Sequence, residues 1–254
     1  MKNISLLALG LTCIVTFSWA QKGDSSKNTG HLLGAVSMTN NGISLIPTFS
    51  LGKPAAVFDM SLGNGKFSFD PELAFSLQAK PWYFLFWGRY KMINASKFKM
   101  NIGAHLGLNF QNLVLPVNGD SMEITNVQRY LAGELSPNYL LTKNISVGLY
   151  CLYARGIDAG TIKNTEFITV NANFSNVGIV NQFYMIIVPQ VYYLQQDNLH
   201  GFYFTSAFTF LRINFPLSLT FIVNESINTQ IVSKKDLVWN MTLIYSFGKK
   251  NISI

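Results

Sequence analysis

The chain has 254 residues, enough for one large domain, and β-barrels of this length are commonly single domains. Only 12% of the residues are charged whereas 49% are hydrophobic, and surfaces in water are normally built from charged side chains, so the composition argues against a cytosolic enzyme. The formal charge of +7 comes from scattered basic residues without a recognition motif, so we expect no nucleic-acid partner.

Residues 1–20 have the pattern of a secretory signal peptide. Lys2 supplies the positive charge, residues 4–17 are apolar, and Ser18-Trp19-Ala20 is a small-x-small cleavage site. The apolar stretch is short for a membrane-spanning helix, and the rest of the chain contains no longer one. We therefore predict export and cleavage of this segment. Cys151 is then the one cysteine left, which excludes an internal disulfide.

Residues 21–41 are read as a polar leader, rich in Gly, Ser and Asn, whose structure the sequence leaves undetermined. From residue 42 to residue 247, apolar and polar residues alternate. The stretch 97–111, KFKMNIGAHLGLNFQ, has an apolar residue at every even position and Lys, Asn, Gly, His or Gln at every odd one. Because side chains alternate across a β-strand, such a segment has one apolar face and one polar face.

This alternation predicts about twelve strands, with ten or fourteen as alternatives. Turn residues separate the strands, and no segment has a helical period. A tail, residues 248–254, follows the last strand. The predicted strands are residues 42–51, 55–62, 66–78, 81–92, 97–111, 122–140, 144–156, 166–177, 181–195, 201–212, 216–225 and 236–247.

The connections between these strands alternate in length. Counted from the first hairpin, every second connection is short, as at residues 63–65 and 214–216. The other series begins with tight turns and then lengthens, at residues 112–121, 157–165 and 226–235. Short turns at one end and longer loops at the other are typical of outer-membrane barrels.

The two faces of the strands differ in a way that indicates a membrane. One face is apolar and rich in aromatic residues, and the other carries small neutral residues, which suit a confined wet interior better than a solvated exterior. We therefore predict an all-β, antiparallel transmembrane β-barrel with apolar side chains against lipid, since lipid requires every backbone group to be paired internally. A secreted soluble β-domain is the alternative. The predicted interface aromatics are Trp82, Tyr90, Trp239, Tyr245 and Phe247.

Two segments carry a resemblance to a known class. The closing stretch 236–247, DLVWNMTLIYSF, together with the signal peptide and the alternating strands, resembles Gram-negative outer-membrane β-barrel proteins. The stretch 70–92, DPELAFSLQAKPWYFLFWGRYKM, is similar to a segment of an uncharacterised, porin-like family of such barrels. The resemblance implies location in the outer membrane, the lipid bilayer as surroundings and the barrel-assembly machinery as a partner. That machinery commonly reads an aromatic at the end of the last strand, here Phe247.

Charged residues on the predicted lumen faces are the candidate functional residues. The hairpin near residues 79–80 places Asp70 about opposite Arg89, and Glu134 is within reach of Lys99. Because buried charges need partners, we expect an ion-pair network that partly plugs the barrel. Whether it selects solutes or only holds strands together stays open. The predicted network comprises Asp59, Asp70, Glu72, Arg89, Lys91, Lys97, Lys99 and Glu134.

We expect no enzymatic site, cofactor or metal. The histidines are His31 in the leader, His105 on a lumen face as a titratable group, and His200 in a loop, none of them in a nucleophile-elbow or zinc motif. His200, Asp197 and Ser206 have the residue types of a catalytic set, but a combination of these types is expected by chance in a chain of this length.

Barrels of roughly eight strands have an interior filled by side chains, and barrels of about sixteen or more enclose an open channel. A barrel of about twelve strands should have a lumen of intermediate width. The sequence therefore favours a narrow passive channel for small polar solutes. A structural barrel that docks to a larger outer-membrane complex, through an unknown protein partner, is the alternative, and a lipid-modifying barrel enzyme comes third.

Overall fold

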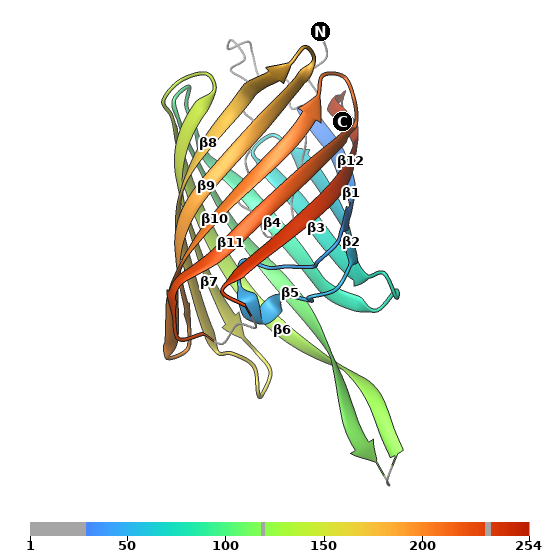
Figure 1. Ribbon diagram of the computed structural model, residues 1–254. Helices are drawn as coiled ribbons and strands as arrows, with labels where there is room; N and C mark the ends of the chain where they lie inside the picture. The colour runs from blue at the N-terminus through green and yellow to red at the C-terminus, as the bar shows by residue number, and fades with distance from the viewer. Residues whose placement is uncertain (1–28, 118–119, 232–234, 254) are drawn as a thin grey trace.

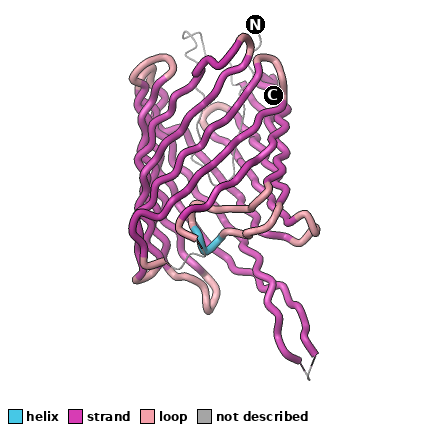
Figure 2. Tube along the Cα trace, viewed as in Figure 1, coloured by secondary structure: helices cyan, strands magenta, loops and turns pink. Residues whose placement is uncertain are grey.

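A computed structural model describes residues 29–117, 120–231 and 235–253. In these residues twelve antiparallel strands form a closed barrel in chain order, in which β1 pairs with both β2 and β12 (Figures 1 and 2). The predicted fold class is confirmed, whereas the predicted signal peptide lies outside the described residues. The strands are β1 (Thr29–Thr39), β2 (Ala55–Asn64), β3 (Phe67–Ser76), β4 (Pro81–Asn94), β5 (Phe98–Val117), β6 (Asp120–Leu140), β7 (Ile145–Gly156), β8 (Asn164–Val180), β9 (Phe183–Gln196), β10 (Leu199–Arg212), β11 (Leu217–Thr229) and β12 (Leu237–Ser253).

The one helix in these ranges is the 3-10 turn η1 (Pro47–Phe49). No helix in the described part of the chain is long and apolar enough to cross a membrane.

The first strand is not where the sequence predicted it. Residues 29–39, read as leader, form β1, and residues 42–51, read as a strand, form an irregular segment around η1. Pro47 has no N–H for a strand ladder and starts the helical turn, and the Ser50 hydroxyl accepts a hydrogen bond from the backbone N–H of Ser44 at 2.9 Å. The predicted number of strands is correct although one of them was misplaced.

The last strand is longer than predicted. Residues 248–253, read as a tail, continue β12 and pair with the beginning of β1, with Lys250 opposite His31. Gly248 makes this continuation possible, because its φ is +133° and a Cβ there would stand 2.3 Å from the carbonyl oxygen of Leu32. The barrel therefore extends beyond the predicted limits 42–247 at both ends.

Side chains follow the predicted alternation between lumen and exterior. The large exposed apolar side chains include Tyr90, Trp239, Tyr245 and Phe247, which are 43 to 51% exposed; their role at the membrane interface stays a prediction. The fifth predicted interface aromatic, Trp82, does not face the exterior: its side chain is buried, with 5% of its surface exposed. A register shift opposite β3 places both Trp82 and Tyr83 among buried residues.

The two ends of the barrel differ (Figure 1). At the turn end lie the start of β1, the end of β12 and connections such as residues 65–66 and 181–182. At the loop end lie longer connections, residues 40–54 and 157–163 among them. Two predicted loops are corrected there: residues 112–117 of the predicted loop 112–121 extend β5, and the connection predicted at residues 196–200 shortens to residues 197–198 between β9 and β10.

A two-stranded ribbon projects beyond the barrel at the loop end (Figures 1 and 2). Pairing of β5 with β4 reaches Asn109, and pairing of β6 with β7 begins at Tyr130. Residues 110–117 and 120–127 therefore pair only with each other, and we call them the β5–β6 ribbon. Eight residues in each strand reach about 27 Å past the wall.

Candidate functional site

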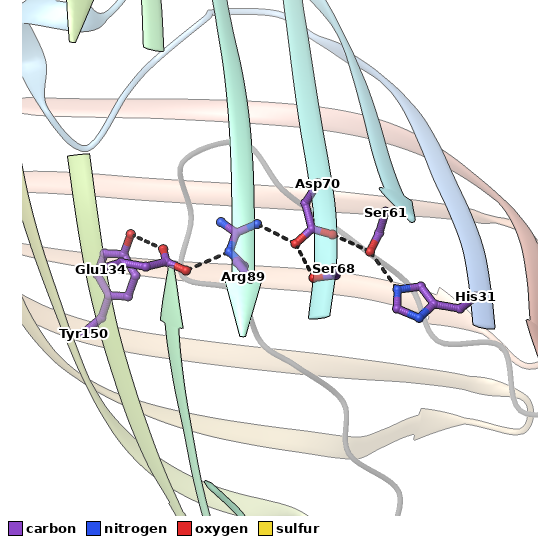
Figure 3. Close-up of polar contacts among 7 residues, drawn as sticks. All are labelled: His31, Ser61, Ser68, Asp70, Arg89, Glu134 and Tyr150. Atoms are coloured by element: carbon purple, nitrogen blue, oxygen red, sulfur yellow. Dashed lines mark hydrogen bonds and ion pairs between the residues drawn. The ribbon is translucent and has the colours of Figure 1, made fainter. Parts of the chain in front are cut away.

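Arg89 stands at the centre of a polar network on the lumen wall (Figure 3). Its Nη1 lies 3.0 Å from Oδ2 of Asp70 on β3, and its Nε donates to Oε1 of Glu134 on β6 at 2.7 Å. The hydroxyl of Tyr150 on β7 donates to the second Glu134 oxygen at 2.9 Å. The two carboxylates and the guanidinium are at most 12% exposed in their side chains, so their charges are partnered away from water.

Gly103 explains how Arg89 reaches Glu134 across an intervening strand. Gly103 on β5 is paired with Arg89 on one side and with Glu134 on the other. A Cβ at this position would lie 2.8 Å from Glu134 Oε1 and 3.1 Å from Arg89 Cγ. The missing side chain therefore leaves the gap through which the ion pair passes over β5.

The network continues to the first strand. Ser61 and Ser68 donate to the two oxygens of Asp70 at 2.5 and 2.9 Å, and His31 Nε2 lies 2.9 Å from the Ser61 hydroxyl. The chain of contacts thus runs from β1 to β7 (Figure 3). The sequence indicated Asp70, Arg89 and Glu134 as members but missed the serines, Tyr150 and His31, because His31 was assigned to the leader.

Asp59 and Glu72 form a second acidic pair. They are directly opposite each other on β2 and β3 and are 3% and 4% exposed. The Tyr83 hydroxyl donates to Glu72, whereas both oxygens of Asp59 lack a hydrogen-bond partner among the described residues. The lumen wall from β2 to β6 therefore carries four acidic side chains, two of which contact the guanidinium of Arg89.

The three predicted lysines do not join this network. Lys91 and Lys97 are exposed and Lys99 is half-buried, toward the turn end of β4 and β5. No ion pair links any of the three to a carboxylate in the described part of the chain. The expectation that Glu134 approaches Lys99 is wrong, because Lys99 is opposite Asn138, which lies four residues beyond Glu134 on β6, toward the turn end.

His105 lies on the lumen side of β5, as predicted. Its ring packs against Trp87 with 4.1 Å between ring centroids. Arg89 lies over the same indole at 4.3 Å from its centroid, so Trp87 connects the histidine with the network.

The segment of residues 40–54 is folded into the loop end of the bore and is called the inner segment. Tyr192 on β9 donates to the carbonyl oxygen of Leu45 at 2.9 Å, and Trp82 Nε1 on β4 donates to the carbonyl oxygen of Phe49 at 2.8 Å. Gln196 on β9 donates to the Thr48 hydroxyl at 2.8 Å. Because β4 and β9 lie far apart around the barrel, these bonds hold the segment across the bore.

Aromatic side chains support the inner segment from the wall. Phe167, Tyr192 and Tyr203 follow one another on β8, β9 and β10, with centroid distances of 4.9 and 4.8 Å. Leu45 and Ile46 belong to the same buried apolar cluster, at 4% and 1% exposure. The loop-end half of the lumen therefore contains a buried apolar cluster, whereas the sequence predicts a bore filled with small polar side chains throughout.

The residues considered for catalysis are not assembled. His200 and Ser206 lie on one strand, six positions apart, which is about 20 Å along a strand. Asp197 accepts hydrogen bonds from the backbone N–H groups of Lys163 and Asn164 at 3.0 and 2.8 Å instead.

Known structures with similar folds are outer-membrane proteins. The KdgM porin in complex with disordered oligogalacturonate aligns with a TM-score of 0.53 and 11% identity, covering 85% of this chain and 99% of that one. The COG4313 outer membrane channel from Pseudomonas putida F1 aligns with a TM-score of 0.51 and 11% identity, covering 91% and 100%.

The chain has the fold of an outer-membrane β-barrel protein. At this low identity the similarity describes the fold. No protein-family model matches the chain, and no curated protein sequence matches it either.

Proposed function

We propose that this barrel is a narrow channel of the outer membrane for small polar solutes, with a preference for cations. The chain would be exported, inserted by the barrel-assembly machinery and oriented with its turn end in the periplasm, as outer-membrane barrels are. Its exposed apolar belt is suited to lipid.

One observation carries the proposal: a polar network runs along the lumen wall with more carboxylates than cationic groups. Asp70 and Glu134 both contact the guanidinium of Arg89, so these three groups have one more acidic than basic member, and the Asp59–Glu72 pair adds two carboxyl groups on β2 and β3. Rings of acidic side chains favour cations in pores, because the low-dielectric wall strengthens their field. The inner segment narrows the loop end, which supports a small conductance.

Conductance across planar lipid bilayers tests this function. We expect small steps and a reversal potential of cation-selective sign in a salt gradient. Glu134→Gln removes one negative charge from the network and should shift the reversal potential toward zero. Glu166→Gln removes an exposed acid outside the network and should leave the potential unchanged. A heat-modifiable, folded barrel that never conducts would refute the channel.

The β5–β6 ribbon favours a second candidate, a barrel that docks to another protein. It projects beyond the wall, where Glu123 pairs with Lys80 of the connection between β3 and β4 at 2.6 Å, and it carries exposed Leu113, Met122 and Val127, at 39, 56 and 42%. An isolated two-stranded ribbon is only marginally stable, so a partner would gain by pairing with it. Purification from native membranes tests this candidate: a stable partner that is lost when the ribbon is shortened, without conductance, would favour docking over the channel.

A further inference from the structure

A partly open chamber lies between the inner segment and the barrel wall. It has a volume of about 120 Å³. The inner segment bounds one side, with Ile46 in the lining, and residues of β1, β2, β4 to β7, β11 and β12 form the others. Residues that line it include Ile46, Trp82, Leu85, Trp87, Leu152 and Ile244.

The lining is apolar in a barrel whose other half is polar. No Asp, Glu, Lys or Arg of the described residues lines the chamber. Most polar side chains around it bond to one another: Thr39 donates to Asn240, whose Nδ2 donates to Thr242 at 3.3 Å, and Asn109 donates to Gln128 at 3.3 Å. His105 is an exception, because its Nδ1 has no partner among the described residues.

These properties decide what the chamber can hold. Most of the lining surface is apolar, and an engineered apolar cavity of roughly 150 Å³ stays dry and takes up benzene. A charged ligand would lose its hydration without gaining a counter-charge. The indoles of Trp82 and Trp87 offer ring surfaces on which an aromatic ligand can pack in an offset or edge-to-face arrangement.

We propose that the chamber binds one small, uncharged, apolar molecule of about the size of a single aromatic ring. This site is separate from the charged network and does not depend on whether ions pass through the bore. The inner segment, held at both walls by hydrogen bonds to its backbone, forms the cover of the site.

Bromobenzene is a suitable probe, because its heavy atom quenches tryptophan fluorescence on contact. The chain has four tryptophans, and Trp19→Phe with Trp239→Phe leaves only Trp82 and Trp87, which both line the chamber. The barrel is reconstituted in lipid nanodiscs, since detergent tails would compete for an apolar site. We expect quenching with a saturable component, whereas bromobenzene dissolved in lipid quenches only in proportion to its concentration.

Filling the chamber provides the decisive comparison. Ala154, 6% exposed on β7, lines the chamber, and Ala154→Phe adds a ring of about the volume that is empty. It should weaken the saturable component by about tenfold or more. Ala104→Phe makes the same change on the exterior of β5 and should leave the saturable quenching component unchanged. Val57→Phe, also in the lining, replaces Ala154→Phe if that variant shows no heat-modifiable barrel on gels.

Strictly linear quenching in the parent protein would overturn the proposal, and so would saturation that persists unchanged in the folded filled variant. In a crystal soaked with bromobenzene, an anomalous bromine peak inside the chamber would support it, and a peak confined to the lipid-facing surface would contradict it. Because these readouts measure no current, a failed channel test leaves them unaffected.

Discussion

Gly103 is the residue on which the lumen network depends most directly, since the ion pair between Arg89 and Glu134 passes over it. Any side chain here would meet Glu134 Oε1 at 2.8 Å. We predict that Gly103→Val separates the pair and leaves Glu134 buried without its counter-charge, at a cost of about 3 kcal/mol or more. The measurement is the urea midpoint of barrel unfolding in lipid vesicles.

Gly133 offers a matched control one strand away on β6. A Cβ at Gly133 would have its nearest contact at 3.8 Å, from the carbonyl oxygen of Gly103, so it meets open space. Gly133→Val should therefore leave the urea midpoint unchanged or raise it slightly, because valine suits a strand better than glycine. Equal losses in both variants would mean that the ion pair contributes nothing specific.

Single residues also mark the limit of what the sequence could predict in the site. The contact between Asp70 and Arg89 was indicated by hairpin register, which is a local property, although the register itself differs: Asp70 is opposite Trp87 and Arg89 is opposite Ser68, so the contact is diagonal. The contact between Arg89 and Glu134 crosses a strand and depends on an absent side chain, so no pairwise pattern indicates it. Tyr192 was missed for another reason: β9 reads FYMIIVPQVYYLQQ, apolar on both faces, and the alternation does not tell which aromatics point inward.

At the scale of elements, the inner segment is a cover held by a few hydrogen bonds. We predict that Tyr192→Phe loosens it, because the hydroxyl bonds both Leu45 O and Asn224 Oδ1 at 2.9 Å. Losing this one donor, shared between the two acceptors, leaves buried oxygens unsatisfied and costs about 1–3 kcal/mol, which corresponds to about tenfold or more in the population of the open form. The readout is the thiol labelling rate at Ser44→Cys in a Cys151→Ser background, since Ser44 is 5% exposed.

Tyr193→Phe is the control for this change, since the neighbouring Tyr193 donates to Gln195 at 2.8 Å and does not touch the inner segment. Its labelling rate should equal that of the parent. If Tyr192→Phe labels no faster, the inner segment is held by its apolar contacts and the hydrogen bonds are incidental.

Elements were predicted well wherever alternation was long and uninterrupted, as from β2 to β11. Between these strands only loop boundaries are corrected, and the two misassigned elements lie toward the ends of the chain. The segment HLLGAVSM gave little signal because a glycine interrupts it and polar residues precede it, and GKKNISI has too few apolar residues to read as a strand. Both become strands because each offers the other an unpaired edge, a long-range cause that local periodicity does not contain.

At the scale of the whole molecule, closure depends on this pairing of the first strand with the last. A chain that starts at residue 42 lacks β1, so it leaves edges of β2 and β12 unpaired in lipid, where each unpaired backbone group costs several kcal/mol. We predict that it does not form a barrel. A chain that starts at residue 22 should form one, and the measurement is gel mobility with and without boiling. Identical heat-modifiable mobility of the two chains would show that β1 is dispensable.

The β5–β6 ribbon differs from the barrel wall in how easily a protease reaches its backbone. It projects about 27 Å beyond the wall with no third strand beside it, so its backbone is the part of the described chain that a protease reaches first. A cut there leaves β1–β5 and β6–β12 hydrogen-bonded to each other along the wall below. The ribbon contains no Lys or Arg, so the protease must be one of broad specificity. We predict that brief proteinase K treatment of intact cells yields two fragments that migrate as one species until boiled, and fragments that separate without boiling would contradict this.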